Sequence, residues 1–185
     1  MATANVVYGC TESGLAIFNK PGTLNEWLPP RLVLQGQRVS AAWAEPGPPT
    51  RVLAIADNHL MASETGGRLW QEAAVEGSLY AIFSVGERML VLSGASGLSL
   101  STDGGVTWAP LPLLPLDGRV VWLGGHEDRT YLLTESSVGH RLLGGDLGSG
   151  KYTVLPVQGV DAVALGQRGI YVAADAGVLE SRDGG

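Results

Sequence analysis

Short apolar runs that alternate with polar positions recur along the chain, separated by Gly, Pro, Asn, Asp and Ser. Alternation with a period of two between such turn residues is typical of half-buried β-strands. Two consecutive units show this most clearly, and the pattern predicts strands at 79–84, 89–93, 98–101, 107–111, 120–123, 131–134, 141–143 and 152–155. No stretch keeps a helical period with caps. We therefore expect an all-β chain with helix over less than about a tenth of its residues.

A sequence repeat sets the length of each unit. The segment Ser101–Trp108 reads STDGGVTW, Ser63–Trp70 is a degenerate copy, and Ser181–Gly185 is a shorter copy. A marker four residues earlier, glycine in most units and His59 in one, places the equivalent positions of the other units. The five equivalent positions are Phe18, Ser63, Ser101, Leu143 and Ser181. Four strands in about 40 residues are typical of one blade of a β-propeller.

The repeated segment has the composition of a tight turn between the third and fourth strands of a blade. The Asp103 carboxylate can accept backbone N–H groups, as aspartates do in turns. Gly104 and Gly105 permit backbone angles that a Cβ would disfavour. Trp108 begins the outer strand, and its indole N–H needs a partner. Trp27 and Tyr152 follow Phe18 and Leu143 by nine residues instead of seven, which predicts longer turns in those units.

These residues give the chain a resemblance to the Asp-box, or BNR, repeat proteins. Their pattern Ser/Thr-x-Asp-x-Gly-x-Thr-Trp is matched in full by Ser101, Asp103, Gly105, Thr107 and Trp108. It is matched in part by Ser63, Gly67, Trp70, Ser181, Asp183 and Gly185. The family includes sialidases, xyloglucan-cleaving hydrolases, the sortilin ectodomain and photosystem II assembly factors. The resemblance therefore implies a propeller but no single activity.

The strand pattern predicts one partial propeller domain over residues 1–185. We expect five units with three, four, four, four and three strands, the first without its innermost strand and the last without its outermost. The simplest interpretation is an incomplete chain of a larger propeller, and the alternative is a permuted five-bladed ring. Because open sheet edges pair with other strands, we expect self-association through these edges.

Charge and cysteine content narrow the classes of partner. The formal net charge is −6, and the basic residues form no cluster. Nucleic acid is therefore not an expected partner. Neither a signal peptide nor a membrane-spanning segment is apparent, so we expect a cytoplasmic protein that does not bind membranes. The lone cysteine, Cys10, is expected to be a small core residue. We expect no cofactor and no metal.

Candidate ligand residues lie in the turns between second and third strands, which face the mouth of a propeller's central funnel. They are Glu12, Asp57, His59, Glu135 and Asp175. Carboxylates on one rim could hold a cation, bind sugar hydroxyls, or provide an acid and a base for glycoside hydrolysis. They could equally be ordinary residues of exposed turns. The segment His126–Arg129 is expected to be a solvated loop at the opposite face.

Aromatic residues recur in the first strands, at Trp43, Phe83 and Trp122. We expect them to pack between blades, and the alternative is an aromatic platform for sugars. The arginine cluster that a sialidase needs to bind a carboxylate is not recognisable. We therefore expect a non-catalytic binding or assembly scaffold whose ligand is a protein or a carbohydrate. The alternatives are a sialidase-like or glucan-cleaving glycoside hydrolase, with catalytic residues on the rim or beyond residue 185, and a propeller without a ligand.

Overall fold

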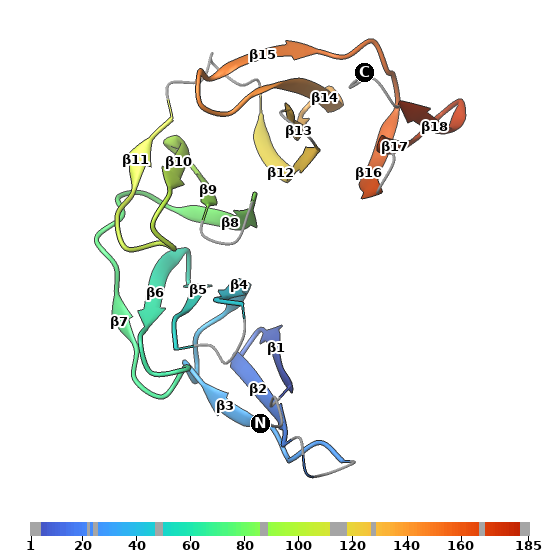
Figure 1. Ribbon diagram of the computed structural model, residues 1–185. Coiled ribbons are helices and arrows are strands. Elements are labelled where there is room, and N and C mark those ends of the chain that lie inside the picture. The colour runs from blue at the N-terminus through green and yellow to red at the C-terminus, as the bar shows by residue number, and fades with distance from the viewer. Residues whose placement is uncertain are drawn as a thin grey trace.

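Five antiparallel sheets follow one another along an open arc (Figure 1). The computed structural model describes residues 5–21, 23, 26–46, 50–85, 89–111, 118–126, 129–166 and 169–181. Sheet 1 contains β1 (Asn5–Thr11), β2 (Gly14–Lys20) and β3 (Arg31–Val33). Sheet 2 contains β4 (Val39–Ala44), β5 (Val52–Ala56), β6 (His59–Ser63) and β7 (Gln71–Glu72). Sheet 3 contains β8 (Leu79–Ser84), β9 (Leu90–Gly94), β10 (Gly97–Ser101) and β11 (Ala109–Pro110).

The last two sheets continue the same up-and-down order. Sheet 4 contains β12 (Arg119–His126), β13 (Arg129–Ser136), β14 (Gly139–Asp146) and β15 (Lys151–Val154). Sheet 5 contains β16 (Val160–Gly166), β17 (Gly169–Ala174) and β18 (Gly177–Ser181). The fold is therefore an all-β propeller arrangement of antiparallel blades, with the strand numbers that the sequence predicts. No helix occurs among the described residues, and hence none that could cross a membrane.

Each four-stranded sheet runs from the inner curve of the arc to its outside. The innermost strands β4, β8, β12 and β16 lie along the inner curve, and β3, β7, β11 and β15 lie along the outside (Figure 1). The innermost strands begin at the end of each sheet where the second strand turns into the third. We call this end the mouth end, and the opposite one the far end.

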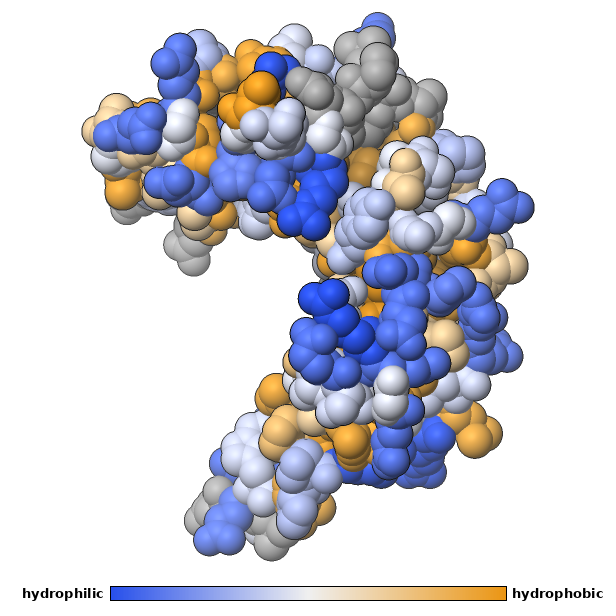
Figure 2. All heavy atoms as spheres, turned by 180° about the vertical axis from the view of Figure 1, so that it is seen from behind, coloured by the Kyte–Doolittle hydropathy of each residue, from blue (hydrophilic) through white to orange (hydrophobic). Residues whose placement is uncertain are grey.

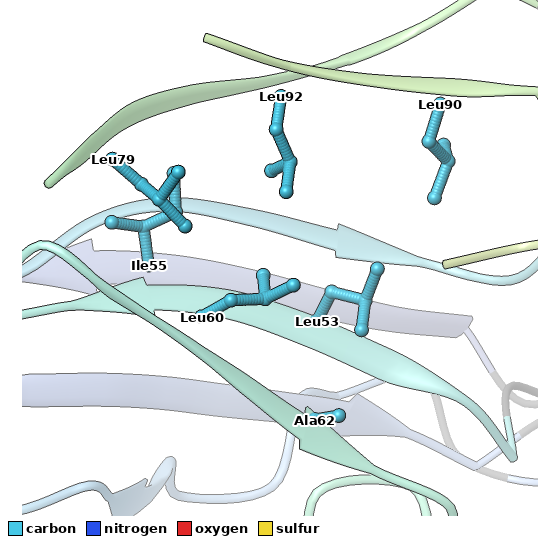
Figure 3. Packing of buried hydrophobic residues seen from close by; sticks show 7 residues of the cluster. All are labelled: Leu53, Ile55, Leu60, Ala62, Leu79, Leu90 and Leu92. Carbon is cyan, nitrogen blue, oxygen red and sulfur yellow. The ribbon is translucent and has the colours of Figure 1, made fainter. Parts of the chain in front are cut away.

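Buried apolar side chains fill the spaces between consecutive sheets. Figure 3 shows the cluster between sheets 2 and 3, where Leu53, Ile55 and Leu60 face Leu79, Leu90 and Leu92. Similar clusters lie between the other neighbouring sheets. Such burial stabilises the arrangement by about 25 cal/mol for each Å² of apolar surface removed from water. Each sheet is therefore held by its neighbours in the arc.

The register of sheet 4 differs from the predicted one by two residues. The backbone N–H groups of Ala73, Leu111 and Leu155 donate to the carbonyls of Leu60, Leu98 and Leu142. The first two acceptors lie three residues before Ser63 and Ser101, so the equivalent position in sheet 4 is Gly145, not Leu143. Tyr152 then follows by seven residues, as the two tryptophans do. The extra residues lie at the mouth end, because β13 and β14 continue to Ser136 and Gly139.

The first-strand aromatics pack between sheets, as the sequence predicts. Trp43, Phe83 and Trp122 contact the clusters that lie between their own sheet and the next. Trp122 packs between sheets from a different strand position, since Gly124 is the residue equivalent to Trp43 and Phe83. A Cβ on Gly124 would lie 2.7 Å from the Trp122 ring. The ring thus covers the glycine and replaces the missing side chain.

Cys10 corrects one expectation about the core. Its side chain is exposed on β1, which is the edge strand of sheet 1. Its cross-strand partner, Leu15, is fully buried on the central strand β2. The strand pattern places Cys10 on the same face of the sheet as Leu15, but a side chain on an edge strand is buried only where another strand or sheet covers it. Cys10 is therefore not a core residue among the described part of the chain.

Candidate functional site

The turn from Ser101 to Trp108, the Ser101 turn, joins β10 to β11 and is organised around one carboxylate. Asp103 Oδ1 accepts the backbone N–H groups of Val106 and Thr107, both at 3.0 Å. Asp103 Oδ2 accepts the Thr107 hydroxyl at 2.6 Å, and the Ser101 hydroxyl donates to Oδ1 at 2.8 Å. Ser101 Oγ in turn accepts the N–H of Gly105 at 2.7 Å. The side chains of the repeat motif therefore satisfy the turn's own polar groups.

These hydrogen bonds favour the charged form of the carboxyl group. The Thr107 hydroxyl and N–H, followed by the Ser101 hydroxyl, hold the pKa of Asp103 well below its usual range. The carboxylate already accepts several local donors. It is therefore placed to stabilise the turn and is poorly placed to bind a ligand.

The turn from Ser63 to Trp70, the Ser63 turn, shows a weaker version of the same arrangement. Ser63 Oγ accepts the N–H of Gly67 at 2.9 Å, like Ser101. Thr65 occupies the place of Asp103, and its hydroxyl accepts the N–H of Leu69 at 2.8 Å. The Trp70 indole donates to the Gly67 carbonyl at 3.1 Å. A hydroxyl thus replaces part of the carboxylate's role.

The equivalent turn of sheet 4, Gly145–Tyr152, uses apolar packing instead. Leu147 takes the place of Asp103 and is buried in the cluster between sheets 3 and 4. Tyr152 takes the place of the tryptophans, and its hydroxyl bonds the Thr130 hydroxyl at 2.5 Å. Asp146 Oδ1 accepts the N–H of Ser149 at 2.6 Å. Burial raises the pKa of Tyr152, and the Thr130 hydrogen bond opposes this rise.

Two of these turns also contact the preceding sheet through arginines. Arg31 of sheet 1 donates to the Gly67 carbonyl at 3.0 Å, and Arg51 of sheet 2 donates to the Gly105 carbonyl at 2.9 Å. Arg51 also pairs with Glu64 of its own sheet at 2.5 Å, and its side chain is only 15% exposed. The Trp108 indole N–H is buried with no hydrogen-bond partner among the described residues. The turns are therefore inter-sheet joints.

Ser181 ends β18 at the position equivalent to Ser101. Two candidate residues of this copy, Asp183 and Gly185, lie outside the described residues.

At the mouth end, Arg38 connects two of the candidate carboxylates. Its side-chain Nε donates to Glu12 Oε1 of sheet 1 at 3.1 Å, and its backbone N–H donates to Asp57 Oδ1 of sheet 2 at 2.9 Å. Asp57 lies with Asn58 in a two-residue turn, where both residues have positive φ. The side chains of Arg38 and Glu12 are 68% and 82% exposed. Such an exposed pair contributes little to stability.

Glu135 forms a second group at the mouth end, in sheet 4. It lies within β13, not in the turn that the sequence predicts for it, because this hairpin continues to Ser136 and Gly139. Glu135 Oε2 pairs with Arg119 Nη2 at 2.6 Å. His140 Nδ1 lies 2.8 Å from the Val160 carbonyl of sheet 5, and its Nε2 lies 3.9 Å from Glu135 Oε1. This group links sheets 4 and 5.

The remaining candidates separate from one another. His59 pairs with Glu72 of the outermost strand β7 at 2.9 Å, and not with another of the candidate carboxylates. Asp175 is exposed in the turn after β17, and its carboxylate lies against Gly159, just before β16. No three His, Cys, Asp or Glu side chains of the described ranges are grouped so that they could hold a metal ion.

Comparisons with known proteins identify the fold. No protein-family model and no curated protein matches the chain. Among solved structures, a GH74 xyloglucanase from Xanthomonas campestris superimposes with a TM-score of 0.66 at 17% identity, covering 100% of this chain and 36% of the enzyme. YCF48 from Cyanidioschyzon merolae gives a TM-score of 0.60 at 15% identity, covering 94% of this chain and 67% of that one. A chain of the nidogen/laminin complex gives 0.54 at 13% identity, covering 97% and 79%.

These neighbours include a glycoside hydrolase and proteins of other kinds. The chain spans about a third of the length of the xyloglucanase, at 36%. At such low identities the likeness establishes the propeller fold and no activity.

Sequence reasoning missed the basic partners at both ends of the sheets. Arg38, Arg119 and Arg51 each contact a residue that is distant in sequence. Two of them had a weak local signal, because Arg38 and Arg119 each directly precede or begin an innermost strand. Nothing local indicated that Arg51 reaches the next sheet.

Proposed function

We propose that residues 1–185 belong to one Asp-box β-propeller domain, which acts as a non-catalytic scaffold and binds a protein at its mouth end. The observation that carries the proposal is how the candidate carboxylates are used. Glu12 and Glu135 are paired with arginines, and Asp57 accepts a backbone N–H group. These carboxylates tie neighbouring strands and sheets together.

A glycoside hydrolase requires a different environment for its carboxyl groups. Its general acid must carry a proton at working pH, which an apolar pocket favours. Glu12 and Glu135 lie instead against guanidinium groups, with side chains 82% and 40% exposed. This arrangement supports the scaffold over the hydrolase.

The three aromatic residues predicted as a possible sugar platform favour a protein over a carbohydrate ligand. Stacking on a sugar needs an exposed ring. Trp43, Phe83 and Trp122 pack into the clusters between sheets. The nidogen/laminin structure shows that a propeller of this general fold can occur in a protein complex. The surface along the inner curve of the arc is rich in hydrophilic side chains (Figure 2), which suits a polar protein segment.

The proposal is tested by peptide selection together with hydrolysis assays. A random peptide display library is selected on the immobilised chain, and the binders are measured again on two variants. Arg119→Gln/Glu135→Gln changes the mouth end, and Lys151→Gln is the control at the far end. We expect binders that lose affinity only for the mouth-end variant.

The hydrolysis assay supplies xyloglucan and sialyllactose to the same protein. We expect neither new reducing ends nor free sialic acid. Release of either product that disappears in Glu135→Gln would establish the hydrolase instead. Failure to select any peptide would reject a protein-binding scaffold.

A further inference from the structure

Each of the four innermost strands carries a β-bulge at the same place. The pairing of the first strand with the second skips one residue in every case, directly after the first buried residue of the strand. The skipped residues are Ser40, Tyr80, Val121 and Asp161. The buried residues before them are Val39, Leu79, Val120 and Val160. We call the four skipped residues the bulge row.

A bulge frees one residue from the ladder and redirects its side chain. Ser40, Tyr80 and Asp161 are exposed, and Val121 is half-buried. Tyr80 is 38% exposed, whereas the other aromatics of the innermost strands pack between sheets. Since β4, β8, β12 and β16 follow one another along the inner curve (Figure 1), the bulge row presents one side chain per sheet near the mouth end.

The unpaired charges around the bulge row are mainly negative. Arg38 and Arg119 lie at the start of innermost strands, but each is paired with a carboxylate. Within the described part of the chain, four acidic residues of the mouth end are in no ion pair: Asp57, Glu76, Asp161 and Asp175. They are distributed over sheets 2 and 5 and the connection before sheet 3. The surface is therefore complementary to a positively charged ligand.

We propose that the bulge row is the docking surface for a basic, extended peptide segment that crosses successive sheets. This rests on the proposed protein-binding function and names the class of its partner. The Tyr80 ring receives an arginine or lysine side chain through a cation–π contact. Asp161, with Asp175 in the same sheet, receives a second basic side chain. Val121, on the sheet between these two contacts, and Ser40, on the sheet before Tyr80, leave room for the peptide backbone.

The test uses fluorescence anisotropy with the full chain and two probes. One probe is a fluorescein-labelled peptide of alternating arginine and glycine, and the other has citrulline in place of each arginine. We expect the arginine peptide to bind at least about tenfold more tightly, with an affinity that falls as salt is added. Equal binding of both peptides would overturn the proposal.

Variants locate the binding to the bulge row. Tyr80→Ala and Asp161→Asn are each expected to raise the Kd by about two- to fivefold. Tyr80→Phe keeps the ring and should bind like the parent. Glu26→Gln removes an exposed charge from the connection between β2 and β3 and is the charge-matched control for Asp161→Asn. Melting curves of all variants confirm that each is folded.

The outcome separates this proposal from the broader one. If Asp161→Asn and Glu26→Gln weaken binding equally, attraction is not located at the bulge row and the proposal fails. If the peptides selected by display lack basic residues and bind Tyr80→Ala unchanged, the scaffold function stands while this docking surface is rejected. If the selected peptides are basic and both Tyr80→Ala and Asp161→Asn lower the affinity for them, both proposals are supported.

Discussion

The contact between the Ser101 turn and the preceding sheet can be tested by adding a single methyl group. Gly105 has a φ of +83°, and a Cβ on it would overlap Cδ1 of Leu53, which is fully buried in sheet 2. It would also lie 3.2 Å from Cζ2 of Trp108. Gly36 is a close control, because its φ is +81° and a Cβ there would meet nothing within 4 Å.

The two alanine variants separate backbone strain from packing strain. A left-handed backbone costs a residue with a Cβ about 1–2 kcal/mol, and both variants share this cost. Gly105→Ala must also displace a buried leucine, which adds about 1–3 kcal/mol of overpacking. We therefore expect Gly105→Ala to lower the free energy of unfolding by about 1–3 kcal/mol more than Gly36→Ala. Urea denaturation with a constant m-value measures the difference.

A double-mutant cycle assigns the extra cost to Leu53. Leu53→Ala alone should cost about 2–5 kcal/mol, because it leaves a cavity between sheets 2 and 3. In that background the added methyl group of Gly105→Ala has room, so its cost should fall toward that of Gly36→Ala. Equal losses for Gly105→Ala and Gly36→Ala, or strict additivity in the cycle, would refute an inter-sheet joint at this turn.

Three further predictions concern the side chains that organise the turns. Asp103→Asn should melt below the parent at neutral pH, and the difference in Tm should become smaller as the pH falls below about 4. The reason is that the pKa of Asp103 is lower in the folded than in the unfolded state, so the carboxylate stabilises the fold above its unfolded pKa and loses this effect as it is protonated. Tyr152→Phe should lower the free energy of unfolding by about 0.5–1.5 kcal/mol in denaturant melts, since it removes the hydrogen bond to Thr130. Restoring the motif's aspartate should have opposite effects in two sheets. Thr65→Asp should stabilise the fold by up to about 1 kcal/mol, whereas Leu147→Asp should destabilise it by more than about 3 kcal/mol because it buries a charge. Denaturant melts of the two variants that shift in the same direction would contradict this prediction.

The sequence predicts the strands and their grouping well because both follow from local pattern. The predicted strand 79–84 is β8 from Leu79 to Ser84. The predicted strand 107–111 shortens to β11, Ala109–Pro110, because Thr107 belongs to the turn that Asp103 organises. Period-two alternation is a property of a few adjacent residues. It therefore survives even where the repeat motif has changed.

Register in sheet 4 could not be predicted from the same signals. The sequence aligns this unit by the marker glycine, Gly139, which follows the turn at the mouth end. That turn lies two residues farther from the far end than the equivalent turns of sheets 2 and 3. The marker glycine is therefore shifted by two residues relative to Gly145, whereas Tyr152 keeps its spacing of seven residues from Gly145. Only the long-range pairing of β14 with β13 and β15 distinguishes Gly145 from Leu143. Glu135 was misplaced for the same reason.

The candidate site was predicted in part for a related reason. Glu12, Asp57 and Asp175 do lie in turns at the mouth end. Their partners could not be predicted, because Arg38 reaches Glu12 across 26 positions and joins two sheets. His59 pairs with Glu72 of the outermost strand, a partner that local pattern does not indicate. Side-chain direction at a strand end is decided by tertiary contacts.

The differences among the turns indicate what has been kept constant in this fold. The Ser101 turn uses a carboxylate, the Ser63 turn a hydroxyl, and the sheet 4 turn a buried leucine at the same position. The aromatic residue seven positions after each start still packs against the preceding sheet, with Trp70, Trp108 and Tyr152 in three successive clusters. Packing between sheets therefore constrains this position more strongly than the hydrogen bonds of the turn do. A unit without a recognisable motif can still be a complete blade, provided that it supplies this aromatic contact.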